Sequence, residues 1–369
     1  MPDARAAIES RCGTGRDSSA RRERPGGAAL SRVHGAGQVR SDLGGRPRCH
    51  RDRAQGITMS GFLHEVGVAV RAGTIMSNGW GTASASVDRL RAAVPDGSVV
   101  LHITPGFVES RHVLGLFLDS RARVCSVAKT ARFEWDSVGV RREAAALARL
   151  VELAPQLRDS VPEVLACVTF AGRDVLLESV LEGEALTHQR VRREPAAAAA
   201  VARWISALPV SGYDDGAMII DELLEPPLAR LDAMAPMGDP IRELASATRI
   251  AVEPLRGMVL PRPFEHGDVS HPNLLVAEHG GRLSVGIVDW ELARERGAPG
   301  HDLAQFEAFT AFARASAHGR AAEGRAFQEA FSAGGRGRRA FTAGLADSVP
   351  LDAIRPLFVL AWARAALRL

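Results

Sequence analysis

The chain has 369 residues, of which 46% are hydrophobic and 24% charged, a composition that supports a packed core and about two domains at ~150 residues each. No run approaches the ~18 uninterrupted apolar residues of a membrane span, and the N-terminus lacks the apolar segment of a secretory signal. The four cysteines are widely spaced, which excludes a zinc ribbon and gives no disulfide framework. We therefore expect a cytoplasmic protein without a membrane span.

The net charge of +3 is unevenly distributed along the chain. Residues 1–60 contain 12 arginines and 6 acidic residues, so this segment carries +6 and the remainder carries −3. A body of that charge disfavours nucleic-acid binding. The segment is rich in Arg, Gly and Ser and cannot bury enough apolar surface to offset its ordering entropy, so we predict a disordered tail. A basic arm for an acidic partner, or upstream sequence before an internal start at Met59 or Met76, are the alternatives.

Residues 61–182 are predicted to form a β-rich N-terminal lobe. Short apolar runs separated by turn residues indicate strands. They cover 98–103, 113–118, 124–129, 163–169 and 174–180. Between the third and fourth runs, the spacing of Glu143, Leu147 and Leu150 predicts a helix over 140–153, which Pro155 closes.

After Gly183 the pattern becomes helical, and residues 183–369 are predicted to form a second, helix-rich lobe. The expected helices cover 195–208, 217–234, 240–256, 302–316, 321–332, 336–346 and 350–368. Loops and short β-like runs interrupt them over 259–293. A strand-rich lobe followed by a helix-rich lobe predicts a two-lobed α+β protein.

The basic residues are almost all arginine. Of 46 Lys and Arg residues only one, Lys129, is a lysine, and it ends a predicted strand. A lysine that persists against such a bias indicates a position where a compact ammonium fits and a planar guanidinium does not.

The segment that carries chemistry runs from His266 to Val276, with the pattern His-Gly-Asp-x4-Asn. An apolar run ending in Asp289 follows sixteen residues after Asn273. Phosphoryl transfer needs a base at the acceptor hydroxyl, a magnesium clamp on the phosphates and a cation on the non-transferred phosphates. Asp268 on its loop suits the base.

The remaining parts of that chemistry are also present. Asn273 and Asp289 offer the hard oxygen donors that magnesium prefers. Lys129 can reach phosphates as a point charge, and Glu143, fourteen residues later on a predicted helix, can pair with it and aim it.

These residues give the sequence a resemblance to the aminoglycoside phosphotransferase and choline kinase-like family, over roughly residues 100–310. The His-Gly-Asp-x4-Asn loop, the Ile-Val-Asp-Trp-Glu run and the later Gly-Ala-Pro-Gly-His-Asp-Leu-Ala segment at 297–304 carry it. The resemblance implies a protein-kinase-like fold, ATP or GTP with Mg²⁺ as cofactors, and a small-molecule hydroxyl acceptor.

Position by position, the resemblance implies a role for each matching residue. Asp268 would be the catalytic aspartate, and Asn273 and Asp289 would be the magnesium ligands. Lys129 would contact the α- and β-phosphates, paired with Glu143. Residues 176–180 would be the hinge, where backbone groups of Glu178 and Val180 meet the nucleobase.

The sequence departs from the family pattern at three places. Ser270 and His271 stand where His and Pro are expected, although the spacing from Asp268 to Asn273 is intact. The candidate phosphate-covering segment, 104–112, is poor in glycine, and Glu134 is an alternative to Glu143 as the partner of the lysine.

The resemblance implies that the acceptor lies against the helices after the catalytic loop. Residues 303–369 of that part contain 9 arginines against 5 acidic residues. A pocket for a polycationic aminoglycoside should concentrate carboxylates, so a neutral or anionic hydroxyl compound is favoured. A catalytically silent kinase-like scaffold that binds nucleotide or a partner is the alternative, supported by the weak glycine loop. The absence of an Ala-Pro-Glu-like segment disfavours a protein kinase, and the sequence leaves the oligomeric state open.

Overall fold

The computed structural model describes residues 99–103, 112–119, 121–133, 138–170, 172–236 and 238–367. The predicted tail (1–60), Glu134 and most of the candidate phosphate-covering segment lie outside the described residues. Within the described ranges, no helix has the length and apolar character needed to cross a membrane.

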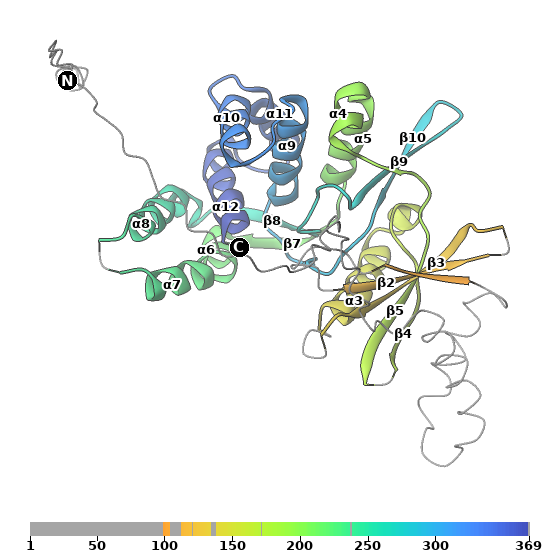
Figure 1. Ribbon diagram of the computed structural model, residues 1–369. Coiled ribbons are helices and arrows are strands. Elements are labelled where there is room, and N and C mark those ends of the chain that lie inside the picture. The colour runs from red at the N-terminus through yellow and green to blue at the C-terminus, as the bar shows by residue number, and fades with distance from the viewer. Residues whose placement is uncertain are drawn as a thin grey trace, which may run out of the picture. The chain divides into compact units, whose positions relative to one another are not determined.

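The N-terminal lobe is built on a five-stranded antiparallel sheet with strand order β1-β2-β3-β5-β4 (Figure 1). Its strands are β1 (Val99–Ile103), β2 (His112–Leu118), β3 (Val124–Ala131), β4 (Val164–Phe170) and β5 (Arg173–Ser179). In this register Lys129 of β3 lies between Leu114 of β2 and Leu176 of β5. The lone lysine is therefore in the centre of the sheet.

Helix α3 (Val138–Leu153) packs against this sheet. Its buried residues Val140, Glu143, Leu147 and Leu150 recur every three or four positions, which places them on one helix face. Val140 packs with Ala131 and Leu176 on the sheet. This packing brings Glu143, whose side chain is fully buried, to the sheet face that carries Lys129. A 3₁₀ turn (Pro155–Ser160) follows, with its proline at the first position.

The C-terminal lobe combines two small sheets with nine helices among the described residues. The sheets are β10-β9-β6 and β7-β8 (β6, Glu184–Ala185; β7, Val210–Asp215; β8, Val259–Pro263; β9, Leu274–His279; β10, Arg282–Ile287). The first helices are α4 (His188–Arg193), α5 (Pro195–Ser206), α6 (Gly216–Leu223), α7 (Glu225–Met234) and α8 (Pro240–Val252). The last are α9 (His301–Arg314), α10 (Arg320–Phe331), α11 (Arg336–Leu345) and α12 (Ile354–Ala366).

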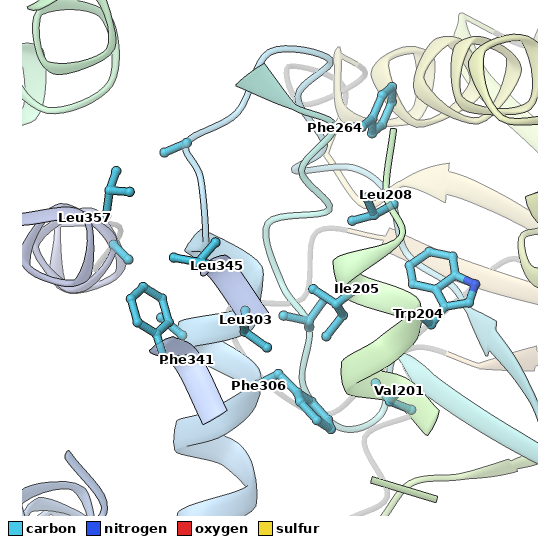
Figure 2. Close-up of a cluster of buried hydrophobic side chains, with 14 of the residues drawn as sticks. Val201, Trp204, Ile205, Leu208, Phe264, Leu303, Phe306, Phe341, Leu345 and Leu357 are labelled. Atoms are coloured by element: carbon cyan, nitrogen blue, oxygen red, sulfur yellow. The ribbon is translucent and has the colours of Figure 1, made fainter. Parts of the chain in front are cut away.

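The core of this lobe is formed where helices distant in sequence meet. Figure 2 shows Trp204 and Ile205 of α5, Leu303 and Phe306 of α9, and Phe341 of α11 in one buried cluster. Helix α9 is buried along most of its length. It therefore provides a rigid base for the segments that pack on its N-terminus.

The α+β architecture predicted from the sequence is confirmed, with differences in detail. The predicted helix over 217–234 is two helices, because Pro226 and Pro227 cannot continue α6 and instead occupy the first turn of α7. Residues 210–215 form β7, which the sequence analysis did not predict, since its pairing with β8 joins segments more than forty residues apart.

Two helical glycines provide a matched test of this packing. A Cβ at Gly216 would lie 2.0 Å from the carbonyl oxygen of Leu255, whereas one at Gly324 would meet nothing within 4 Å. We expect Gly216→Ala to lower the free energy of unfolding by on the order of 1–3 kcal/mol. Gly324→Ala, within α10, should raise it by up to about 1 kcal/mol. Urea denaturation of both variants measures the difference, and equal effects would contradict the close approach of α6 to Leu255.

Candidate functional site

Lys129 is the centre of a buried cluster of charges. Its Nζ atom lies 2.5 Å from Glu143 Oε1, 3.3 Å from Asp289 Oδ1 and 3.6 Å from Glu178 Oε2. The three carboxylates come from α3, the segment after β10, and β5. The lysine therefore joins the N-terminal sheet to the segment that contains Asp289.

The cluster contains more negative than positive charge. Burial would lower the pKa of Lys129, but the neighbouring carboxylates of Glu143, Glu178 and Asp289 raise it well above its usual range. Burial raises the pKa of Glu178 to about 8, with Lys129 opposing the shift. Burial would also raise the pKa of Asp289, but the neighbouring ammonium of Lys129 holds it below its usual value. The lysine is thus charged, and burial favours the protonated form of Glu178.

Glu143 has a second function in the geometry. The same Oε1 atom that contacts Lys129 accepts a hydrogen bond of 2.9 Å from the backbone N–H of Trp290. Asp289, one residue earlier, has φ 71°, a left-handed conformation that non-glycine residues seldom adopt. Strained backbone of this kind concentrates at functional sites and needs support from its surroundings.

Asp302, at the start of α9, fixes the backbone of the loop that contains Asp268. Asp302 accepts hydrogen bonds from the backbone N–H groups of His266 (2.7 Å) and Gly267 (2.8 Å). Its position at the N-terminus of a helix suits a negative charge.

His266 is fully buried and edge-on to the Trp290 indole, with ring centroids 4.5 Å apart. Its Nδ1 accepts from the N–H of Asp268, so the proton is on Nε2, which donates to the carbonyl of Val288. Burial lowers the pKa of His266 and favours this neutral form. The histidine therefore connects the Asp268 loop to the segment that precedes Asp289.

The Asp268 carboxylate is oriented by two short side chains. Ser270 Oγ donates to Oδ1 at 2.9 Å, and Asn273 Nδ2 donates to Oδ2 at 3.1 Å. Each carboxylate oxygen has a further lone pair, so the group can accept a proton from a third molecule. Ser270, at the position where the sequence departs from the family pattern, thus supports Asp268.

Asn273 and Asp289 are brought together by the backbone. The N–H of Val288 donates to the carbonyl of Asn273 at 3.0 Å. The amide nitrogen of Asn273 donates its hydrogen bond to Asp268, so the amide oxygen remains available as a metal ligand. An amide oxygen and a carboxylate are donors that suit Mg²⁺, so this pair fits a magnesium site.

Two further possible metal ligands, His112 and Glu291, were missed in the sequence analysis. His112, Asp289 and Glu291 have ligand atoms within 4.8 Å of one another, and His112 Nε2 lies 3.6 Å from Glu291 Oε2. Glu291 lies only two residues after Asp289 in the sequence, and that proximity is the signal that could have identified it. His112 comes from β2, so only the tertiary structure identifies it.

The two predicted hinge residues lie in different environments. The Glu178 side chain is buried at Lys129, a contact the sequence did not predict. Val180 follows the end of β5 and its side chain is 38% exposed. The N–H of Ser179 donates to Glu163 on the β4 side.

The chain matches the profile of the family described as "Phosphotransferase enzyme family" over residues 116–342. No curated protein sequence matches it. Among solved structures, an ethanolamine kinase of Plasmodium vivax is 10% identical, with 84% of this chain and 82% of that chain covered and a TM-score of 0.47. The aminoglycoside phosphotransferase APH(3'')-Id of Streptomyces rimosus is 20% identical, with 76% and 97% covered and a TM-score of 0.41.

The protonated Glu178 predicts a pH-dependent stability. The folded state holds a proton that the unfolded chain releases near pH 4.5, so the free energy of unfolding should fall as the pH rises from about 4.5 to about 8. The side chain in Glu178→Gln is neutral at every pH. The free energy of unfolding of this variant, relative to that of wild type, should therefore increase by on the order of 1–3 kcal/mol between pH 5.5 and pH 8.5. Urea denaturation at both pH values measures this. Glu152→Gln, at an exposed position of α3, is the control. If the stability difference between Glu178→Gln and wild type does not change with pH, Glu178 is not protonated in the folded state.

Proposed function

This chain belongs to the phosphotransferase enzyme family, and on that premise we propose that it is a small-molecule kinase that transfers the γ-phosphate of ATP or GTP to a hydroxyl group, with Mg²⁺. One observation carries the proposal. A carboxylate on a supported loop, Asp268, is joined through Asn273 and Val288 to Asp289, which contacts the buried ammonium of Lys129. These are the base, the metal ligands and the cation that phosphoryl transfer requires.

Asp268 acts at the acceptor. Its carboxylate takes the proton of the acceptor hydroxyl while the acceptor oxygen bonds to the γ-phosphorus and the bond from that phosphorus to the β-γ bridging oxygen breaks. Ser270 and Asn273 keep the carboxylate in one orientation, so little reorganisation accompanies the transfer.

Asn273 and Asp289 would hold the metal through their side-chain oxygens. Bound Mg²⁺ supplies positive charge to the phosphate oxygens. Asp289 is positioned for this by the bond from Trp290 N–H to Glu143, which fixes the backbone immediately after it.

Lys129 would contact the α- and β-phosphates. In the structure its ammonium is within 4 Å of three carboxylates, and Glu143 makes the shortest of these contacts. Glu143 therefore keeps the ammonium in place, while the longer contacts to Asp289 and Glu178 are those that phosphate oxygens can replace.

Backbone groups of Glu178 and Val180 would meet the nucleobase. In an extended strand, successive residues direct their N–H and C=O groups to opposite edges. The N–H of Ser179 donates to the carbonyl of Glu163, and Val180 lies beyond the last residue of β5 that pairs with β3, so that pairing does not use the backbone groups of Val180. We place the boundary between the nucleotide-binding lobe (61–182) and the acceptor-binding lobe (183–369) just after this hinge.

A neutral or anionic hydroxyl compound is the acceptor class we favour, because the C-terminal region is net basic. The second candidate function, a silent scaffold, requires one of the catalytic groups to be misplaced. Asp268, Asn273 and Asp289 are instead connected by hydrogen bonds, which favours the kinase.

Replacing Asp268 tests the role of the base. Asp268→Asn keeps the size of the side chain but cannot accept the proton, so turnover should fall by about 10²–10⁴-fold while the Kd for nucleotide changes little. Nucleotide hydrolysis and acceptor phosphorylation measure turnover, and calorimetry measures the Kd. Asp347→Asn, at an exposed position, should leave both unchanged. Wild-type turnover in Asp268→Asn would overturn the assignment.

Replacing Asp289 tests the metal site. Asn tolerates the left-handed backbone of this position, so Asp289→Asn should fold. In wild type, ATP at 100 times its Kd should add about 2.7 kcal/mol of stability. We expect Mg²⁺ to increase this stabilisation in wild type and not in the variant, as measured by the shift in Tm. If neither ATP nor GTP shifts the Tm of the wild type, the protein is not a nucleotide-dependent kinase.

A further inference from the structure

His112, Asp289 and Glu291 bring three metal-binding side chains together around the predicted magnesium ligand Asp289. Their ligand atoms all lie within 4.8 Å of one another, and among the described residues no other His, Cys, Asp or Glu side chains form such a group of three. His112 begins β2, whereas Asp289 and Glu291 follow β10. The group therefore exists only where the N-terminal sheet lies against the segment after β10.

The spacing between His112 and Glu291 fits two ligands of one metal ion. His112 Nε2 lies 3.6 Å from Glu291 Oε2, which is longer than a hydrogen bond. Two ligand atoms of a tetrahedral zinc ion, each about 2.0–2.1 Å from the metal, lie roughly 3.3–3.4 Å apart. A small adjustment of either side chain therefore places both atoms on one ion.

The surroundings leave room for an ion and a way for it to enter. A Cβ at Gly139, at the start of α3, would lie 3.2 Å from Glu291 Oε2 and 3.4 Å from His112 Nε2, so the glycine lets both atoms approach the helix. The His112 side chain is 8% exposed, whereas those of Glu291 and Asp289 are 17% and 35% exposed. An ion can therefore arrive from solvent on the carboxylate side and meet the imidazole at the buried side.

The charge of the group suits a divalent ion. The ammonium of Lys129 is 2.5 Å from Glu143 and 3.3 Å from Asp289, so Glu143 is the carboxylate that balances the lysine. Asp289 and Glu291 then supply two negative charges, equal in size to the charge of the ion. His112 supplies an imidazole nitrogen, which zinc and similar transition metals accept as a ligand, whereas magnesium prefers oxygen.

We propose that His112, Asp289 and Glu291 form a site for a transition-metal ion of the zinc type. This ion and Mg²⁺ both use Asp289, so each excludes the other, and the transition metal inhibits phosphoryl transfer. Binding of the ion stands on the geometry of these residues and does not depend on kinase activity. Only the competition with Mg²⁺ rests on the proposed function.

Zn²⁺ is the probe, and its binding to the full chain without nucleotide is measured by competition with a chromophoric chelator. His112→Gln and Glu291→Gln should each weaken binding by more than about tenfold, since loss of a group that merely supports a ligand already costs that much. Asn273→Ala removes a predicted magnesium ligand outside the group and should change Zn²⁺ binding less than twofold. His279→Gln is the matched control, because His279 lies 3.4 Å from Glu182 in an exposed pair.

Co²⁺ provides a second measurement, because its visible absorption reports the geometry and type of its ligands. We expect His112→Gln to change this absorption and His279→Gln to leave it as in wild type. The Tm of each metal-free variant shows that it is folded. Other cysteines and histidines are common to all these chains, so the difference between variants is the measured quantity. Equal Zn²⁺ binding in wild type and a folded His112→Gln would overturn the proposal.

The shared ligand Asp289 predicts competition between the two metals. With Zn²⁺ buffered at a free concentration above its Kd, the Mg²⁺-dependent part of the ATP-induced shift in Tm should disappear in wild type and persist in His112→Gln. If Zn²⁺ binds without affecting that shift, the two metals do not share Asp289 and the inhibitory role is wrong. If ATP produces no shift at all, the kinase proposal fails, and the differences in Zn²⁺ binding among the variants still decide whether the metal site exists.

Discussion

A single carboxylate oxygen, Glu143 Oε1, connects the three parts of the site. It contacts the ammonium of Lys129 on β3 and accepts the N–H of Trp290 after β10, while its own backbone belongs to α3. Buried charges are costly unless each is paired and hydrogen-bonded, so the position of each partner limits the others. The orientation of Asp289 therefore depends on the packing of α3 against the sheet.

The Asp268 loop depends on a different support. Asp302 fixes the backbone of His266 and Gly267, and α9, which carries Asp302, is buried in the helical core. His266 connects this loop to Val288 through the hydrogen bond from its Nε2 to the Val288 carbonyl. Asp268 is thus positioned by the C-terminal lobe and Lys129 by the N-terminal lobe, and both sets of contacts reach the segment of Val288 and Asp289.

The parts predictable from the sequence were those with local signals. The fixed spacing from Asp268 to Asn273, the lone lysine and the helical spacing around Glu143 each lie within a short segment. The Glu178 contact with Lys129 and the approach of His112 to Glu291 depend on strand register and on lobe packing, which no local pattern encodes. The same holds for β7. The break between α6 and α7 was readable from Pro226-Pro227, but the apolar periodicity on both sides outweighed it.

The burial of Lys129 also determines how the whole chain reacts with reagents directed at amines. It supplies the only side-chain amine in 369 residues, and that amine is 6% exposed and held in its protonated form by carboxylates. Acylation requires a neutral, accessible amine. In the folded protein, acylation of this lysine is therefore suppressed, and any acylation that occurs reports separation of α3 from β3 rather than the chemistry of the surface.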